Sequence, residues 1–365
     1  MKKKWSVKKK ILMSILAVIA VLLLVVIGYV IYVFASYHRI DDKQTLKINS
    51  LNGDESLKVT TDNEYTIGTY NVGFGAYTPD YSFFMDGGKY SRCFSRQSGI
   101  DAINGAADLA KSGNPDFMLF QEVDRDSTRS YHVNQEQLIN KKFDGYFQNF
   151  AVNYDSAYLF YPFNEPIGKS YSGIDVYSKY QITAALRRSF PISTSFSKFL
   201  DLDRCYSVSR VNVDNGKELI IYAVHMSAYG NSDEIRKAQT TMLFDDMKSE
   251  MDKGNYVICG GDFNHDLKLA EDDSVEYESW AYPFPRSQMP KGLSFAMDQL
   301  SKDKYDSLAD SNRNDDTEYK PGKTFTCILD GFIISDNVEM TDYTIKDTGF
   351  LYSDHQPVFM KFKLK

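Results

Sequence analysis

The sequence predicts a layered α/β domain that follows one N-terminal membrane-spanning helix. An apolar run of 24 residues, Ile11 to Phe34, stands near the start of the 365-residue chain. From Glu64 onward, short strand-like runs alternate with helical segments, the order typical of α/β domains. Hydrophobic residues make up 43% of the chain and charged residues 25%, which supplies a core and excludes a disordered or collagen-like chain.

The N-terminal segment has the features of a membrane anchor. Its apolar run is preceded by Lys2, Lys3, Lys4, Lys8, Lys9 and Lys10. As a helix the run would be ~36 Å long, which exceeds a ~30 Å hydrocarbon core. Because a basic flank favours the cytoplasm, we expect residues 1–10 to be a cytoplasmic tail, residues 11–34 a single-pass span of the cell membrane, and the remainder extracytoplasmic. A cleaved signal peptide ending near Ala35 is the alternative; the run is longer than a typical signal sequence, which favours the anchor.

Charge and cysteine content limit the kind of partner and site. Beyond the first 34 residues, 36 Lys and Arg face 49 Asp and Glu, a formal charge of −13. This balance argues against avid non-specific binding to nucleic acid and fits a site that concentrates metal cations. The absence of a CxxC pair argues against a zinc site of paired cysteines. The four cysteines are Cys93, Cys205, Cys259 and Cys327.

The predicted strands are short apolar or β-branched runs. Residues 35–63, which precede them, are polar and acidic and are interpreted as a stalk or linker, or as an early strand. The strands are expected at Tyr65–Tyr70, Phe117–Phe120, Leu219–Val224, Tyr256–Cys259, Phe332–Ile334 and Val358–Met360.

Two segments between these strands have helical spacing. Ser98–Lys111 ends before Gly113, and Asn231–Lys253 begins at a capping Asn231 and ends at Gly254. No linker rich in Pro, Gly or Ser divides the chain after residue 64, so residues 64–365 are predicted to form one domain.

Polar side chains gather where the predicted strands end. They are Asn71, Glu122, His225, Asp262, Asn264, Asp330, Asp354 and His355. Strand ends lie side by side in a sheet, so these groups are expected to converge. Clustered carboxylates repel one another unless a hard cation such as Mg²⁺ is bound. A carboxylate can take a proton from water, and a His held by an Asp can stabilise a charged phosphoryl oxygen. The pattern therefore favours phosphoester hydrolysis.

The same segments resemble the endonuclease/exonuclease/phosphatase superfamily, which includes deoxyribonucleases, abasic-site endonucleases, neutral sphingomyelinases and inositol-phosphate phosphatases. The resemblance runs from about Glu64 to Leu364. It is carried by Thr69-Tyr70-Asn71, Phe120-Gln121-Glu122-Val123, Val224-His225, Gly261-Asp262-Phe263-Asn264, Leu329-Asp330-Gly331-Phe332 and Ser353-Asp354-His355. It implies a four-layer α/β/β/α sandwich with two packed mixed β-sheets, here a catalytic domain at residues 64–365.

The resemblance also implies a divalent-metal site. Glu122 would bind Mg²⁺ or Mn²⁺, with Asn71 and Asp354 nearby.

For catalysis, the resemblance implies that Asp262 orients or deprotonates the attacking water and that Asn264 holds this water or a phosphate oxygen. His355, oriented by Asp330, would stabilise the transition state. His225 would contact phosphate or assist the leaving oxygen.

Residues that select the substrate are less defined. Arg125, Arg129 and Trp280 are expected to contact it, although Asp124 stands where pancreatic-type deoxyribonucleases place an Arg. The aromatic run Tyr154–Phe163 is expected to be a buried strand, with lining of the cleft as the alternative. A nucleic acid, a phospholipid headgroup and a small phosphoester remain open as substrates of a monomeric enzyme. A catalytically inactive superfamily member that serves as a surface binding module is the alternative function.

Overall fold

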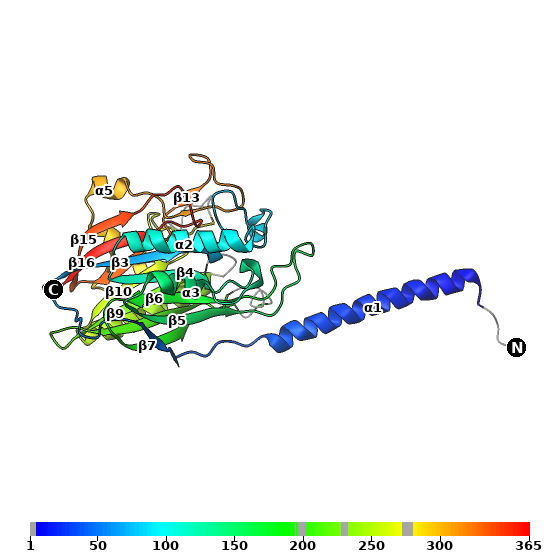
Figure 1. Ribbon diagram of the computed structural model, residues 1–365, viewed down its shortest axis with the longest axis horizontal. Coiled ribbons are helices and arrows are strands. Elements are labelled where there is room, and N and C mark those ends of the chain that lie inside the picture. Colours follow the sequence, from blue (N-terminus) through cyan, green and yellow to red (C-terminus); the bar gives the residue numbers. More distant parts are fainter. Residues whose placement is uncertain (1–4, 194, 196–201, 228–232, 272–279) are drawn as a thin grey trace.

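A computed structural model shows two β-sheets packed face to face, with helices on their outer faces (Figure 1). It describes residues 5–193, 195, 202–227, 233–271 and 280–365. This arrangement confirms the predicted α/β sandwich. Within the described residues, each of the two large sheets has seven strands.

The first sheet is mixed, because β9 and β10 are parallel whereas its other neighbours are antiparallel. Its strands lie in the order β1 (Gln44–Thr45), β7 (Ile182–Ser189), β8 (Cys205–Asn212), β9 (Glu218–His225), β10 (Tyr256–Asp262), β14 (Asp330–Ser335) and β11 (Leu293–Phe295).

The second sheet is also mixed, with β3 and β4 parallel. Its order is β15 (Val338–Ile345), β16 (Val358–Leu364), β3 (Glu64–Asn71), β4 (Phe117–Asp124), β6 (Tyr171–Ser178), β5 (Tyr146–Asp155) and β2 (Ile48–Leu51). A separate two-stranded sheet joins β12 (Asn312–Arg313) to β13 (Thr326–Cys327).

Successive side chains of β4 point alternately to the two faces of its sheet, one packed on the other sheet and one covered by helices. Phe117 and Leu119 point into the core between the two sheets, whereas Met118 and Phe120 pack against helices on the outer face. The helices of the domain are α2 (Arg96–Ser112), α3 (Gln135–Lys142), α4 (Asp233–Asp252) and α5 (Lys302–Asp306). Short 3-10 turns lie at Gly73–Gly75, Phe84–Asp86, Thr128–Ser130, Arg286–Gln288 and Ala296–Gln299.

The predicted helices are present with small shifts at their ends. Ser95 caps α2 through a reciprocal pair of hydrogen bonds with Ser98. Helix α4 corresponds to the predicted helix at 231–253, but the predicted cap at Asn231 lies outside the described residues.

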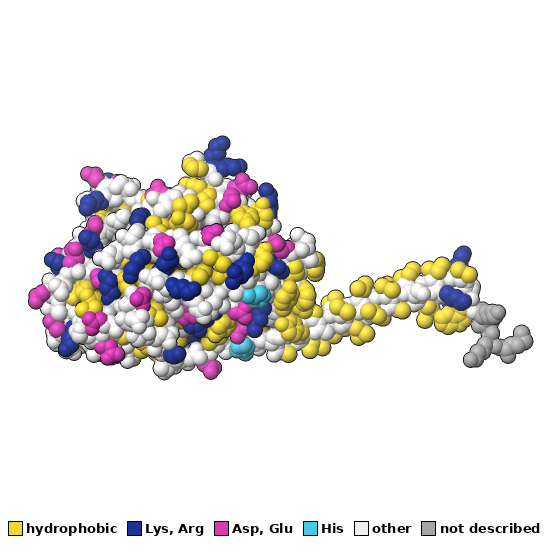
Figure 2. Space-filling view, in the orientation of Figure 1, with side chains coloured by type: hydrophobic (Ala, Val, Ile, Leu, Met, Phe, Trp, Pro, Cys, Tyr) yellow, Lys and Arg dark blue, Asp and Glu magenta, His cyan; other side chains and the backbone are white. Residues whose placement is uncertain are grey.

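Helix α1 (Val7–Ser36) projects from the domain as a single 30-residue rod (Figure 1). Among the described residues of α1, Val33 alone is buried. The helix is long and apolar enough to cross a bilayer, a property that it shares with signal sequences. Figure 2 shows hydrophobic side chains along its exposed length.

For two segments the sequence leaves the structure open or misjudges it. Residues 35–63 are expected to be a stalk or linker, or an early strand, and the structure favours the strand alternative: β1 and β2 add to the edges of both sheets, and Val59 is fully buried beside Val213. Edge pairing satisfies backbone groups whatever the side chains, so a polar composition could not decide between the alternatives. The buried strand expected at Tyr154–Phe163 ends at Asp155, and the rings of Phe160, Tyr161 and Phe163 are exposed.

Candidate active site

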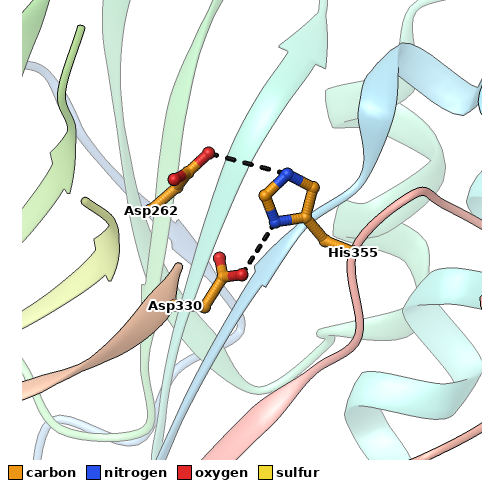
Figure 3. A group of neighbouring side chains, drawn as sticks. All are labelled: Asp262, Asp330 and His355. Carbon is orange, nitrogen blue, oxygen red and sulfur yellow. Dashed lines mark hydrogen bonds and ion pairs between the residues drawn. The ribbon is translucent and has the colours of Figure 1, made fainter. Parts of the chain in front are cut away.

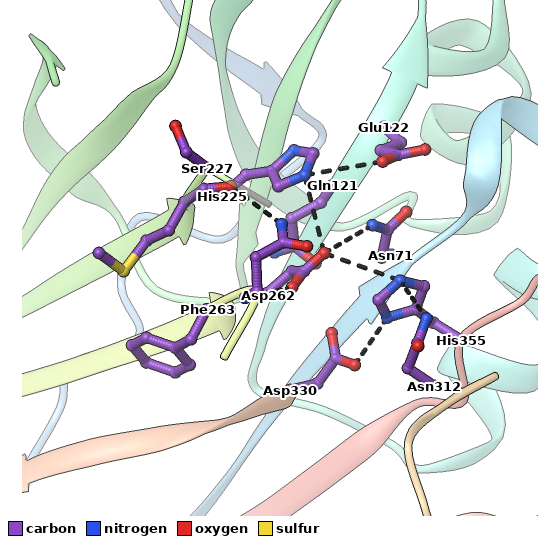
Figure 4. A network of polar contacts seen from close by, with 12 residues as sticks. Asn71, Gln121, Glu122, His225, Ser227, Asp262, Phe263, Asn312, Asp330 and His355 are labelled. Carbon is purple, nitrogen blue, oxygen red and sulfur yellow. Dashed lines mark hydrogen bonds and ion pairs between the residues drawn. The ribbon is translucent and has the colours of Figure 1, made fainter. Parts of the chain in front are cut away.

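The ends of three neighbouring strands bring the central residues of the site together. In the first sheet Asp262 lies opposite His225 on one side and Asp330 on the other. Gly261 has φ +145, and a Cβ there would lie 2.1 Å from the carbonyl oxygen of Val224, so only glycine fits before Asp262. Figure 4 shows the side chains converging between the two sheets.

His355 lies between two carboxylates (Figure 3). Its Nδ1 is 2.7 Å from Asp330 Oδ2, and its Nε2 is 3.7 Å from Asp262 Oδ2. Burial opposes a charge on this imidazole, but the carboxylates of Asp330, Asp262 and Asp354 raise the pKa of His355 well above its usual value. The imidazolium therefore donates to Asp330 and directs its second N–H toward Asp262.

Hydrogen bonds fix the carboxylate of Asp262. Asn71 donates from Nδ2 to Oδ2 over 3.0 Å, and the backbone N–H of Asn264 donates to Oδ1 over 2.8 Å. The side-chain amide of Asn264 donates to the carbonyl of Met226 over 2.9 Å. Asp262 is thus held with its oxygens toward His355 and His225.

Glu122 is a largely buried carboxyl group near other acids. It lies at a bulge of β4 with φ +59, and its Oε1 is 3.6 Å from His225 Nε2. Its Oε2 is buried and accepts no hydrogen bond from the described residues. Burial, and next the charge of Asp354, raise the pKa of Glu122 to about 8, although His355 partly offsets them.

These features fit a divalent cation. An unsatisfied buried carboxylate oxygen near a second carboxylate, Asp354, offers the hard oxygen ligands that Mg²⁺ and Mn²⁺ prefer. Ligand atoms of Asp262, Asp330 and His355 also lie within 4.8 Å of one another. In that group, however, the hydrogen bond to Asp330 already occupies His355 Nδ1, which suits proton handling better than metal binding.

His225 has a partner that the sequence did not indicate. Nη1 of Arg204 donates to His225 Nε2 over 2.7 Å and to the carbonyl of Met226 over 2.9 Å. Burial, and next the charge of Arg204, lower the pKa of His225 well below its usual value, so its Nε2 accepts. Arg204 directly precedes β8, whose pairing of Tyr206 with Val224 places it there.

Asn312 is a second residue that the motifs missed. Its side-chain amide contacts His355 Nε2 over 3.0 Å, where the amide oxygen can accept from the imidazolium N–H. Asn312 comes from the short strand β12. A bridge between residues 312 and 355 sets this contact, and it has no local sequence signal.

The three residues expected to contact substrate are engaged within the protein. Arg125 forms a two-point ion pair with Glu136. Arg129 is buried, forms an ion pair with Asp124, and lies 3.2 Å from the ring centre of Phe74. Trp280 is half-buried and donates from Nε1 to Asn314 Oδ1.

Comparisons with known proteins identify a family and a shared fold. A model of the endonuclease/exonuclease/phosphatase family matches residues 68–293. A search of curated proteins found no match.

Solved structures share the fold at low sequence identity. An endonuclease/exonuclease/phosphatase protein from Beutenbergia cavernae DSM 12333 is 15% identical over 82% of this chain and 72% of that one, with a TM-score of 0.59. TDP2 of D. rerio, complexed with a single-strand DNA product, is 15% identical over 83% and 100%, with a TM-score of 0.55. The catalytic domain of human Nocturnin, with a bound sulfate anion, is 15% identical over 88% and 98%, with a TM-score of 0.51.

Proposed function

The chain belongs to the endonuclease/exonuclease/phosphatase family, whose members are metal-dependent phosphoesterases, and we propose that it hydrolyses phosphoester bonds at the site around Asp262. One observation carries this proposal: Asp262 lies between the charged His355 and His225, and Glu122, whose Oε2 is buried without a hydrogen-bond partner among the described residues, lies 3.6 Å from His225. A base, a cationic donor and an unsatisfied carboxylate thus meet in one place.

Asp262 acts as the base toward the attacking water. Its hydrogen bonds with Asn71 and Asn264 fix the carboxylate, so that little reorientation is needed when the proton moves. Asn264 also borders the position of the water or of a phosphate oxygen.

His355 stabilises the negative charge that develops on the phosphoryl oxygens. Asp330 keeps the imidazole charged and oriented through Nδ1, and the N–H at Nε2 faces Asn312 and Asp262 at the position where substrate would bind. On the other side of Asp262, the Arg204–His225 pair contacts phosphate or the leaving oxygen.

Glu122, with Asp354 and Asn71 nearby, would hold Mg²⁺ or Mn²⁺. The bound cation would supply charge neutralisation and Lewis acidity at the phosphoryl group. Substrates of the site are phosphodiesters or phosphomonoesters of a nucleic acid, a phospholipid headgroup or a small molecule.

Helix α1 is proposed to anchor the enzyme in the cell membrane, with residues 1–10 in the cytoplasm and the domain outside. The lysines before the apolar run support this orientation. The length and exposure of α1 support a membrane span.

The test is hydrolysis of bis-(4-nitrophenyl) phosphate by the full chain in lipid nanodiscs, with Mg²⁺, with Mn²⁺ and with EDTA. The parent is compared with Glu122→Ala, His355→Ala and, as a control, Glu339→Ala on the exposed face of β15. We expect metal-dependent turnover by the parent and the control, and loss in the two site variants. Equal rates in all four proteins would favour a surface binding module without activity.

A further inference from the structure

The loop after β5 presents an unusual surface. This segment, residues 157–166 and hereafter the aromatic loop, carries Phe160, Tyr161 and Phe163, which are 50%, 63% and 85% exposed. Adjacent exposed rings of this kind are uncommon on a soluble protein surface and mark contact with an apolar partner.

The aromatic loop is held in a fixed position. Leu159 and Gly168 exchange two backbone hydrogen bonds of 3.1 and 3.0 Å at its base. The Nε of Arg92 donates to the carbonyl of Pro166 over 2.7 Å, and Ser91 Oγ donates to the carbonyl of Glu165. The rings are therefore displayed on an ordered support.

The same loop contacts helix α1. Tyr29 donates from its hydroxyl to the carbonyl of Tyr158 over 3.1 Å, and the N–H of Tyr158 donates to the hydroxyl of Tyr32 over 3.0 Å. The rings of Tyr29 and Phe160 meet edge to face, with centroids 5.2 Å apart. Figure 2 shows hydrophobic side chains gathered on the edge of the domain from which α1 emerges.

These contacts place the aromatic loop at the level of a bilayer surface. About 20 helical residues cross a hydrocarbon core, so a span that starts at Ile11 ends at about Val30, between Tyr29 and Tyr32. Tyrosines concentrate at such interfaces, where the ring meets lipid and the hydroxyl meets polar groups.

The surface continues from the aromatic loop to the second 3-10 turn after β3, Phe84–Asp86. The rings of Phe84 and Tyr161 lie 5.8 Å apart, and the neighbouring Met85 is 57% exposed. Two separate segments therefore present apolar side chains beside the anchor.

We propose that the aromatic loop, together with Phe84 and Met85, inserts into the outer headgroup region of the bilayer that α1 spans. The domain then rests against the membrane rather than turning freely on its anchor. This inference depends on the proposed anchor, and the partner of the docking surface is a lipid bilayer. Buried apolar rings would supply the affinity, as they do in interfacial segments.

The test is spin-label depth in the full chain reconstituted in phosphatidylcholine–phosphatidylglycerol vesicles. Single cysteines are introduced as Phe163→Cys and Met85→Cys, with Leu57→Cys and Val18→Cys as references. All four native cysteines are buried, so the added thiol is the one that reacts in the folded protein. Leu57 is 43% exposed and follows β2. Strand β2 pairs through Leu51 with Tyr146, the first residue of β5. The aromatic loop follows the other end of β5, ~30 Å along the strand.

We expect labels at 163 and 85 to be more accessible to oxygen and less accessible to a water-soluble nickel chelate than the label at 57. Their immersion depth should lie between those of the labels at 57 and 18. If labels at 163 and 85 behave like the label at 57 while Val18 is immersed, the docking surface is refuted and the anchor stands. If Val18 is also open to nickel, the anchor and the docking surface are both refuted. Circular dichroism of each variant checks that it is folded.

Discussion

Two clusters of buried acids stand in the same sheet sandwich and differ in how their oxygens are satisfied. In the cluster under α3, hereafter the α3 cluster, Asp175 accepts hydrogen bonds on Oδ1 from Gln148 and on Oδ2 from Tyr177. Glu136 accepts from Arg125 on both oxygens, over 2.6 and 2.7 Å. Every carboxylate oxygen of this pair has a donor.

The candidate active site lacks this saturation. Glu122 Oε2 and Asp330 Oδ1 are buried and accept no hydrogen bond from the described residues. Burial raises the pKa of Asp175 and of Glu122 alike, to about 8. A raised pKa therefore does not separate the clusters, whereas an unsatisfied carboxylate oxygen does. Such an oxygen is costly to bury, and a bound cation would complete it.

The largest expected effect comes from replacing one Asp in each cluster by Asn. Asp262→Asn should lower kcat/KM for the phosphodiester by ~10³-fold, because the base is lost while the shape is kept. Asp175→Asn should leave kcat/KM near the parent value. Steady-state kinetics on both variants checks this, and a comparable loss in Asp175→Asn would end the distinction between the clusters.

The next effect concerns the response to metal. At 100 times its Kd, a divalent cation should stabilise the parent by ~2.7 kcal/mol. Glu122→Gln should lose most of this increment, because a neutral amide binds a hard cation more weakly than a carboxylate does. Without metal near pH 7, the variant and the parent should unfold at similar temperatures, since burial raises the pKa of Glu122 to about 8 and keeps its carboxyl protonated. Thermal unfolding with Mg²⁺ and with EDTA measures both quantities, and Asp175→Asn is the control that should keep the response to metal.

A smaller effect follows from the titration of the α3 cluster. Folded Asp175 keeps its proton up to about pH 8, whereas the unfolded chain loses it near pH ~4. This contribution to stability is present below pH ~4 and is lost as the pH rises toward 8. The free energy of unfolding of Asp175→Asn, minus that of the parent, should therefore grow by at most ~1.4 kcal/mol per pH unit over this range and level off above it. Urea titrations in EDTA from pH 5 to 9 test this; a difference independent of pH would contradict it.

The smallest effect tests the Tyr177 hydroxyl of the α3 cluster. Tyr177→Phe removes a hydroxyl that lies 2.7 Å from both Asp175 Oδ2 and Asn140 Oδ1, and it should cost ~1 kcal/mol of stability. The hydrolysis rate should not change. A loss of activity without a loss of stability would show that the two clusters are coupled.

Strand-end motifs predicted much of the site. Asp262, Asp330 and His355 each stand beside an apolar run in the sequence, and register then brings them together. Arg204 and Asn312 could not be found in this way, because each reaches the site through pairing with a distant segment that no local pattern encodes.

The central strands of the sandwich were also predictable from local apolar runs, whereas its edge strands were not. Continuous apolar runs such as Phe117–Phe120 mark central strands that are buried on both faces. The edge strands β1 and β2 bury little, so their composition is that of a linker. The exposed rings of the aromatic loop show that an aromatic run in the sequence can lie on the surface of the domain as well as in its core.

The most direct test of the account is the position of a bound ion, measured by anomalous diffraction from crystals of the full chain grown with Mn²⁺. We predict one anomalous peak ~2.1 Å from the carboxylate of Glu122. A peak between Asp330 and His355, or no peak in the site at all, would contradict the assignment of Glu122 as the metal ligand.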